Sequence, residues 1–79
     1  MEIELKNFIQ NIASALEDEN IKELGVNVKL EDIDGWDSFA IMSVIAMIDE
    51  EYNVIIGGDE ISKIDTLQEL YDLIRSRMI

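Results

Sequence analysis

Residues 37–51, with the sequence DSFAIMSVIAMIDEE, contain the longest apolar run of the chain. From Phe39 to Ile48 every residue except Ser43 is apolar. A helix that is apolar on nearly all sides is either central in its bundle or presents apolar surface to a partner. Asp37 or Ser38 can cap its first turn, since either side chain can accept a hydrogen bond from a free backbone N–H group. The stretch predicts a central helix over residues 38–51.

Two further helices are predicted by apolar residues that recur at three- and four-residue steps. The first runs from about Ile3 to Leu16 and the last from about Thr66 to Met78, where Asp65 or Thr66 can act as the cap. The residues from Asp59 to Lys63 can form one short helix. The apolar stripes consist of Leu5, Phe8, Ile9, Ile12 and Leu16 in the first helix, and of Leu67, Leu70, Tyr71, Ile74 and Met78 in the last.

A long irregular stretch from about Glu17 to Trp36 separates the first helix from the central one, and Ile21–Leu24 can add one turn of helix within it. Loops of this length are uncommon in compact domains and tend to be functional. Val54–Ile56 is too short for a strand in a sheet and is interpreted as an extended linker. We expect an all-α protein with a single domain over residues 1–79: a small four-helix bundle with three main helices, one short helix and a long first loop.

The charge balance narrows the classes of partner. The 79 residues contain 18 acidic and 6 basic side chains, for a net charge of -12. Such a surface repels nucleic acids and anionic membranes and attracts basic protein partners. The chain lacks Cys and His, which excludes disulfides and thiolate chemistry and removes the commonest general base and neutral metal ligand. Composition therefore favours a binding protein over an enzyme.

Neither a secretory signal nor an apolar run of membrane-spanning length is visible in the sequence, so the cytoplasm is the expected location.

The residues Asp32-Ile33-Asp34-Gly35 resemble part of a calcium-binding EF-hand loop. If Gly35 is the invariant glycine of an EF-hand loop, then Leu30 and Ile41 stand where oxygen ligands are needed. The calcium motif fails, and no metal site is predicted.

Ser38 has an ordinary explanation as a helix cap, but its position allows more. Its hydroxyl stands at the positive end of a helix, where backbone N–H groups favour a phosphate. No His accompanies it, and all four Lys lie in polar stretches, so nothing in the chain is placed to activate it as a catalytic nucleophile. Ser38 is therefore a candidate attachment point for a phosphodiester and no catalyst.

The chain resembles an acyl carrier protein over essentially its whole length. In that family an Asp-Ser-Leu-like triplet opens the second of four helices, and Asp37-Ser38-Phe39 stands in that place. The resemblance continues through Asp49-Glu50-Glu51-Tyr52, through Ile56 followed by Asp59-Glu60, and through Lys63-Ile64-Asp65-Thr66-Leu67. The match of the triplet together with the downstream run makes the resemblance specific.

The resemblance implies a 4'-phosphopantetheine arm on Ser38, next to Asp37, attached from coenzyme A by a phosphopantetheinyl transferase. Acyl or related groups would travel as thioesters on the arm's thiol. Further partners would be acyl-transferring or acyl-activating enzymes whose basic patches dock on the central helix. The carrier would be a monomer that binds neither nucleic acid nor membrane. The residues expected to contact partners are Asp37, Phe39, Ile41, Ile45, Asp49, Glu50 and Glu51.

Departures from the family pattern indicate a specialised carrier. Phe39 replaces the usual Leu, Trp36 precedes the triplet, and Ala40 and Ser43 stand where fatty-acid carriers often have acids. Bulky Met47 and Ile61 argue against a long sequestered chain, since small residues are frequent at these positions. The residues expected to line a cargo space are Met42, Met47, Ile56, Ile61 and Ile64.

Three alternatives remain open from the sequence. A carrier for fatty-acid synthesis competes with a carrier for a polyketide, peptide or surface-polysaccharide pathway. An unmodified acidic helical adaptor that binds a basic protein explains the capped helix and the charge equally well. A metal-binding module is the third and weakest reading.

Overall fold

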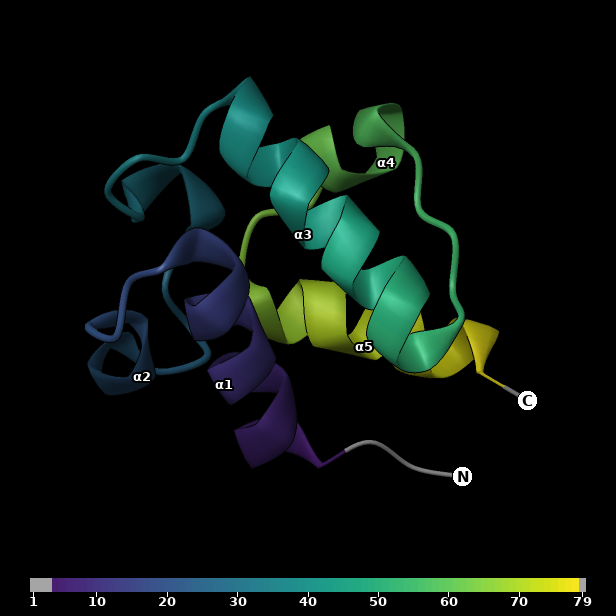
Figure 1. Cartoon of the computed structure of the whole chain (residues 1–79), viewed down its shortest axis with the longest axis horizontal. Coiled ribbons are helices and arrows are strands. Elements are labelled where there is room, and N and C mark those ends of the chain that lie inside the picture. Colours follow the sequence, from purple (N-terminus) through teal and green to yellow (C-terminus); the bar gives the residue numbers. More distant parts are fainter. Residues whose placement is uncertain (1–3, 79) are drawn as a thin grey trace.

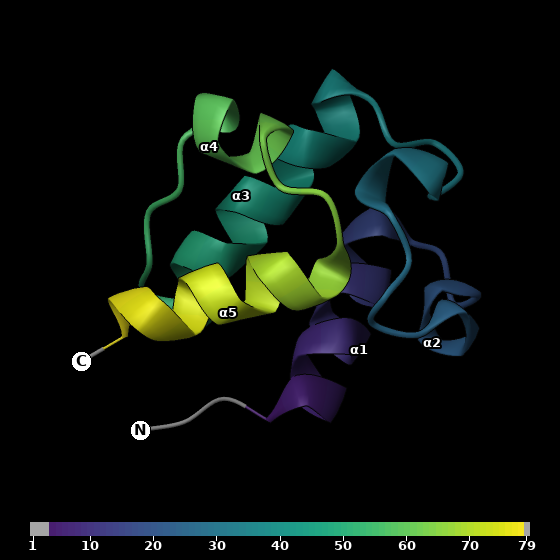
Figure 2. The ribbon, with the colours of Figure 1, turned by 180° about the vertical axis from the view of Figure 1, so that it is seen from behind.

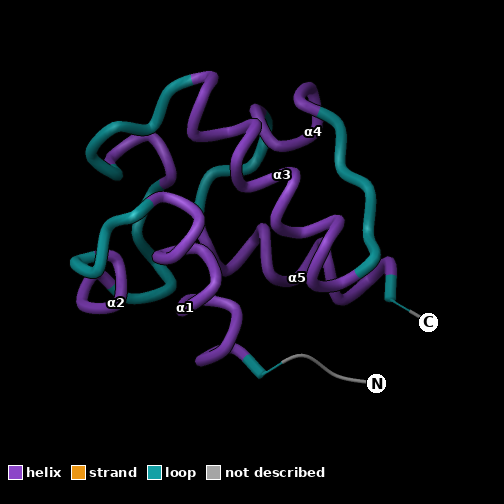
Figure 3. The backbone as a smooth tube through the Cα atoms, viewed as in Figure 1, coloured by secondary structure: helices purple, strands orange, loops and turns teal. Residues whose placement is uncertain are grey.

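The computed structural model describes residues 4–78 and shows an all-α fold. Within these residues no strand forms, and an isolated bridge joins Lys29 to Thr66. The all-α prediction is therefore confirmed. The helices pack into a body of 32 × 25 × 19 Å (Figures 1 and 3). They are α1 (Leu5–Leu16), α2 (Ile21–Leu24), the 3-10 turn η1 (Leu30–Asp32), α3 (Ser38–Tyr52), α4 (Gly58–Ser62) and α5 (Leu67–Arg77).

The central helix α3 begins at Ser38, as predicted, and continues one residue beyond the predicted end. Of the two candidate caps, Asp37 takes the role: its Oδ1 accepts a hydrogen bond from the N–H of Ala40 at 2.9 Å. The helix ends where Asn53 adopts the left-handed conformation (φ 57°) and its N–H donates to the carbonyl of Asp49. α1 packs against one side of α3, and α4 lies on the other (Figure 1).

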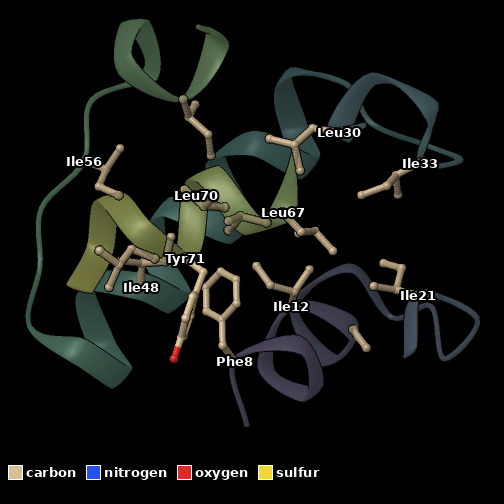
Figure 4. Packing of buried hydrophobic residues seen from close by; sticks show 14 of the residues in the cluster. Phe8, Ile12, Ile21, Leu30, Ile33, Ile48, Ile56, Leu67, Leu70 and Tyr71 are labelled. Carbon is tan, nitrogen blue, oxygen red and sulfur yellow. The ribbon is translucent and has the colours of Figure 1, made fainter. Parts of the chain in front are cut away.

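The core is built from apolar side chains of all these elements around the aromatic ring of Phe8 (Figure 4). The ring centroids of Phe8 and Tyr71 lie 5.6 Å apart, and those of Phe8 and Tyr52 lie 6.3 Å apart, in the range that favours aromatic pairs. Asn11 donates from Nδ2 to the Tyr52 hydroxyl at 2.8 Å. This contact ties the middle of α1 to the last residue of α3.

The stretch between α1 and α3 contains more regular structure than a loop. It forms α2, at the turn that the sequence allowed, and η1, which was not predicted (Figure 2). Ile21, Leu30 and Ile33 are buried and fix the segment to the core. The carbonyl groups of Val26 and Val28 accept hydrogen bonds from the N–H groups at the start of α5. The buried residues of this segment are irregularly spaced along the sequence, so a search for a helical period did not predict η1.

Two short segments complete the bundle. The linker after α3 is extended, with Val54 and Ile56 buried and Ile55 exposed. α4 begins one residue before the predicted short helix, and Glu60 Oε1 accepts from the N–H of Gly57 at 3.0 Å. Arg77 forms a two-pronged ion pair with Glu60 and donates to the carbonyl of Ile55 at 3.0 Å. These contacts connect the linker and α4 to the end of α5.

The first and last helices are shorter than predicted. α1 begins at Leu5, and Ile3 lies outside the described residues. α5 covers Leu67–Arg77, and Thr66 is its cap, with its hydroxyl accepting from the N–H of Glu69 at 3.2 Å.

Candidate functional site

Ser38 is exposed at the first position of α3. Asp37 accepts the hydrogen bond of the Ala40 N–H. The N–H groups of Ser38 and Phe39, at the N-terminal end of the helix, have no partner within the helix. Within residues 4–78 the Ser38 hydroxyl makes no hydrogen bond to a basic side chain that could remove its proton. The position therefore offers an accessible oxygen at the positive end of a fifteen-residue helix, and it supplies no base of its own.

The chain approaches Ser38 through a tight turn. The N–H of Trp36 donates to the carbonyl of Ile33 at 3.1 Å, and Gly35 has a φ of 77°, a conformation that side-chain-bearing residues rarely adopt. Ile33 is buried, and Trp36 is half-buried against the core. These anchors hold the start of α3 in place while Asp34, Asp37 and Ser38 stay exposed.

The residues expected to contact partners lie in two kinds of environment. Phe39 is 78% exposed, an unusual value for a large apolar side chain, whereas Ile41 and Ile45 are half-buried against the core. The acidic residues Asp49, Glu50 and Glu51 are exposed in the last turn of α3. Their role in docking stays a prediction.

The five residues expected to line a cargo space differ in their exposure. Met42 is 68% exposed on the surface of α3, and Met47 lines a hollow between α3 and α1. Ile56 and Ile61 are buried in the core, and Ile64 is half-buried against it. The bulky side chains of Met47 and Ile61 both pack against the core. A role of the five residues in holding a cargo stays a prediction.

A 4'-phosphopantetheine group fits the residues at Ser38. Its phosphodiester needs an oxygen that solvent and a transferase can reach, and the Ser38 hydroxyl provides one. Its negative charge favours a helix N-terminus with free N–H groups, which α3 presents. When attached, the group supplies a thiol, which this chain lacks entirely.

The shifted pKa values belong to residues that hold the fold together. Burial raises the pKa of Tyr52, partly opposed by its hydrogen bond with Asn11. The hydrogen bonds from Arg77 and from the N–H of Gly57 lower the pKa of Glu60 to about 2. The same ion pair raises the pKa of Arg77. Tyr52 and Glu60 thus belong to contacts between helices, of α3 with α1 and of α4 with α5.

Sequence reasoning missed the contribution of α1 to this region. Two hollows lie between α1 and α3, and their α1 walls include Ser14, Ala15 and Glu17. The signal available in the sequence was the presence of small residues, Ser14 and Ala15 in α1 and Ser43 and Ala46 in α3, which also fit ordinary close packing. Asn11 was likewise missed, because its partner Tyr52 is 41 positions away in the sequence.

Two further properties of residues 4–78 concern membranes and metals. None of their helices is long and apolar enough to cross a membrane. No group of three acidic side chains in this part of the chain is arranged to hold a metal ion.

Comparison with known proteins agrees with this geometry. The family model described as "phosphopantetheine attachment site" matches residues 7–74. The actinorhodin polyketide synthase acyl carrier protein of Streptomyces coelicolor is 38% identical over 53 residues, which cover 67% of this chain and 60% of that protein. No solved structure matches significantly. The chain therefore belongs to the phosphopantetheine-attachment family, the family of the acyl carrier proteins that it resembles in sequence.

Proposed function

We propose that this protein carries acyl or related intermediates as thioesters on a 4'-phosphopantetheine arm attached to Ser38. The observation that carries the proposal is the exposed Ser38 hydroxyl at the capped start of α3, inside the region that matches the attachment-site family. We further propose that the protein is a carrier and no enzyme, with the domain spanning residues 1–79. The cytoplasmic location and the monomeric state stay predictions.

Attachment requires a transferase because Ser38 lacks a base. The Ser38 oxygen attacks the phosphorus of coenzyme A that bears the pantetheine. The new Ser38 O–P bond forms as the P–O bond to adenosine 3',5'-bisphosphate breaks, and a base of the transferase takes the hydroxyl proton. Each turnover consumes one coenzyme A and releases one nucleotide. The chain's own contribution is to present the hydroxyl at the end of α3, with Asp37 capping the helix.

The cargo pathway is proposed to be a specialised one, such as polyketide synthesis. Ala40 and Ser43 leave the front half of α3 without charge, and Phe39 and Met42 expose apolar surface there. The similarity to a polyketide carrier supports this choice over a fatty-acid carrier. Partners would then combine apolar contacts near Ser38 with basic groups near Asp49, Glu50 and Glu51.

Intact-mass measurement tests the proposal. Incubation with coenzyme A, magnesium and a promiscuous phosphopantetheinyl transferase should add one phosphopantetheine to the wild-type chain and none to Ser38→Ala. Ser62→Ala is a suitable control, because Ser62 also lies in a helix and is exposed. A wild-type chain that gains no mass, or a Ser38→Ala chain that still gains it, would show the assignment to be wrong.

An unmodified adaptor is the second candidate, favoured by the exposed apolar residues Phe39 and Met42 on an acidic surface. Such an adaptor needs no modification at Ser38. Protein purified from its native cells distinguishes the two candidates: a modified fraction supports the carrier, and full activity of Ser38→Ala in those cells supports the adaptor.

A further inference from the structure

A hollow of about 450 Å³ lies between the first half of α1 and the short helix α2. The two helices lie side by side (Figures 1 and 2). The volume falls within the range of about 300–1,000 Å³ that is usual for small-molecule sites. None of the residues that line this hollow adjoins Ser38 in the sequence, and none of them lines the hollows between α1 and α3. The lining residues are Leu5, Lys6, Ile9 and Gln10 of α1 and Lys22 of α2.

Leu5 and Ile9 give the hollow an apolar floor. They lie four residues apart on one side of α1, and both are half-buried against the core. The floor runs about 6 Å along the helix, which is the rise of four residues. Lys6 and Gln10 follow one residue later, rotated by about 100° around the helix axis, and both are exposed. The hollow therefore joins an aliphatic surface to polar side chains at its rim.

The charge around this hollow is opposite to that of the whole molecule. The chain has 18 acidic and 6 basic side chains, yet the hollow is lined by two lysines and by no acidic residue. The two hollows between α1 and α3 are lined by acidic residues and by no basic ones. An anion is therefore the ligand that the hollow beside α2 favours.

Both lysines have N–H donors to offer to an anion. Within residues 4–78, Lys6 forms no ion pair. Lys22 Nζ lies 2.9 Å from Oε1 of Glu19, but both side chains are exposed, and exposed ion pairs are weak. An ammonium group has three N–H donors, and Glu19 accepts one of those of Lys22. The amide of Gln10 is a further donor, so the rim can satisfy both oxygens of a carboxylate.

We propose that the α1–α2 hollow binds a small carboxylate with an aliphatic tail. The carboxylate lies at Lys6 and Lys22, and the tail lies on Leu5 and Ile9. A neutral apolar molecule would use only the floor of the hollow, and an inorganic anion would use only its rim. The floor of about 6 Å matches a tail of about four carbons. The inference goes beyond the proposed function, because the hollow can be filled whether or not Ser38 carries an arm.

Chemical-shift titration of the isotope-labelled wild-type protein tests the site with acetate, butanoate, hexanoate and hexanamide as ligands. We expect hexanoate to shift the amide signals of residues 5–10 and 21–24. Its Kd should be about tenfold lower than that of butanoate, since each buried methylene contributes about fourfold in affinity. Hexanamide has the same tail without the charge and should bind about fivefold more weakly than hexanoate. Equal affinities for hexanoate and hexanamide, or shifts centred on other residues, would overturn the proposal.

Removal of the two charges tests the rim. The double variant Lys6→Gln and Lys22→Gln is compared with Lys29→Gln and Lys63→Gln, which makes the same change of net charge at exposed lysines outside the hollow. We expect the first to raise the Kd of hexanoate about tenfold and the second to raise it less than about twofold. Equal effects of the two would overturn the site. Ser38→Ala should bind hexanoate as wild type does, and a weaker affinity of that variant would contradict the separation of this hollow from Ser38. Failure of Ser38 loading would contradict the proposed function and leave the titration unchanged.

Discussion

The hydrogen bond from the N–H of Ala40 to Asp37 Oδ1, 2.9 Å long, predicts that Asp37 stabilises the start of α3. Asp37→Ala removes the acceptor and leaves the N–H group without its partner. Loss of such a cap costs about 1 kcal/mol, within a range of about 0.5–2 kcal/mol. Asn is as good a cap as Asp, so Asp37→Asn should change the free energy of unfolding by less than about 0.5 kcal/mol.

Unfolding followed by circular dichroism measures this difference. A loss of 1 kcal/mol lowers Tm by about 4–8 °C for a domain of this size. With a urea m-value of about 1 kcal/mol/M, the midpoint falls by about 1 M. An Asp37→Ala protein with the wild-type Tm, or an Asp37→Asn protein as unstable as Asp37→Ala, would refute the capping role.

The same pair separates capping from docking. Asp37→Asn keeps the cap but removes a negative charge next to Ser38. Its loading rate should therefore fall relative to wild type at low salt although its Tm is nearly unchanged. The two rates should converge at 1 M NaCl, where the Debye length is about 3 Å. Equal rates at all salt concentrations would restrict Asp37 to a structural role.

Three other predictions concern the packing around α3 and α4. The hydrogen bonds from Arg77 lower the pKa of Glu60 to about 2, from the usual value of 4.5. Its ion pair with Arg77 therefore stabilises the fold fully above pH 4.5 and loses this effect as the pH falls toward 2. The difference in unfolding free energy between wild type and Glu60→Gln, from urea titrations at several pH values, should shrink over that interval, and a constant difference would contradict the account. Tyr52→Phe removes the acceptor of Asn11 Nδ2 and should cost about 0.5–1.5 kcal/mol. Burial raises the pKa of Tyr52, so the folded protein resists ionisation of this hydroxyl and should lose stability as the pH rises above 10, whereas Tyr52→Phe has no hydroxyl to ionise. If wild type and Tyr52→Phe lose stability equally at alkaline pH, this role of Tyr52 is wrong. Ile61 is the buried residue of α4. Ile61→Ala should lower the free energy of unfolding by about 2–5 kcal/mol, and Ile61→Val by about 0.5–1.5 kcal/mol. Similar losses for the two variants would show that Ile61 is not packed as described.

Most of the helices could be predicted from the sequence, because helix formation follows local rules. Apolar steps and caps placed the main helices to within a few residues, since both depend on neighbours three or four positions apart. The same rules singled out Ser38, which starts the most apolar helix of the chain. Its family follows from the match over residues 7–74, which the run after Ser38 had already indicated.

Long-range packing decided what the sequence left open. Ile21, Leu30 and Ile33 order the segment after α1 through contacts with distant residues, and such contacts leave no local period. The apolar run of α3 did not say which side chains are buried: Met42 is exposed, Met47 lines a hollow beside α1, and Ile48 lies in the core. The hollows between α1 and α3 are lined from both helices, by residues that are far apart in the sequence. The helices and the candidate serine could be read from the sequence because both depend on residues a few positions apart. Which surfaces remain exposed for a partner could be read only from the tertiary structure, because burial depends on which helices meet.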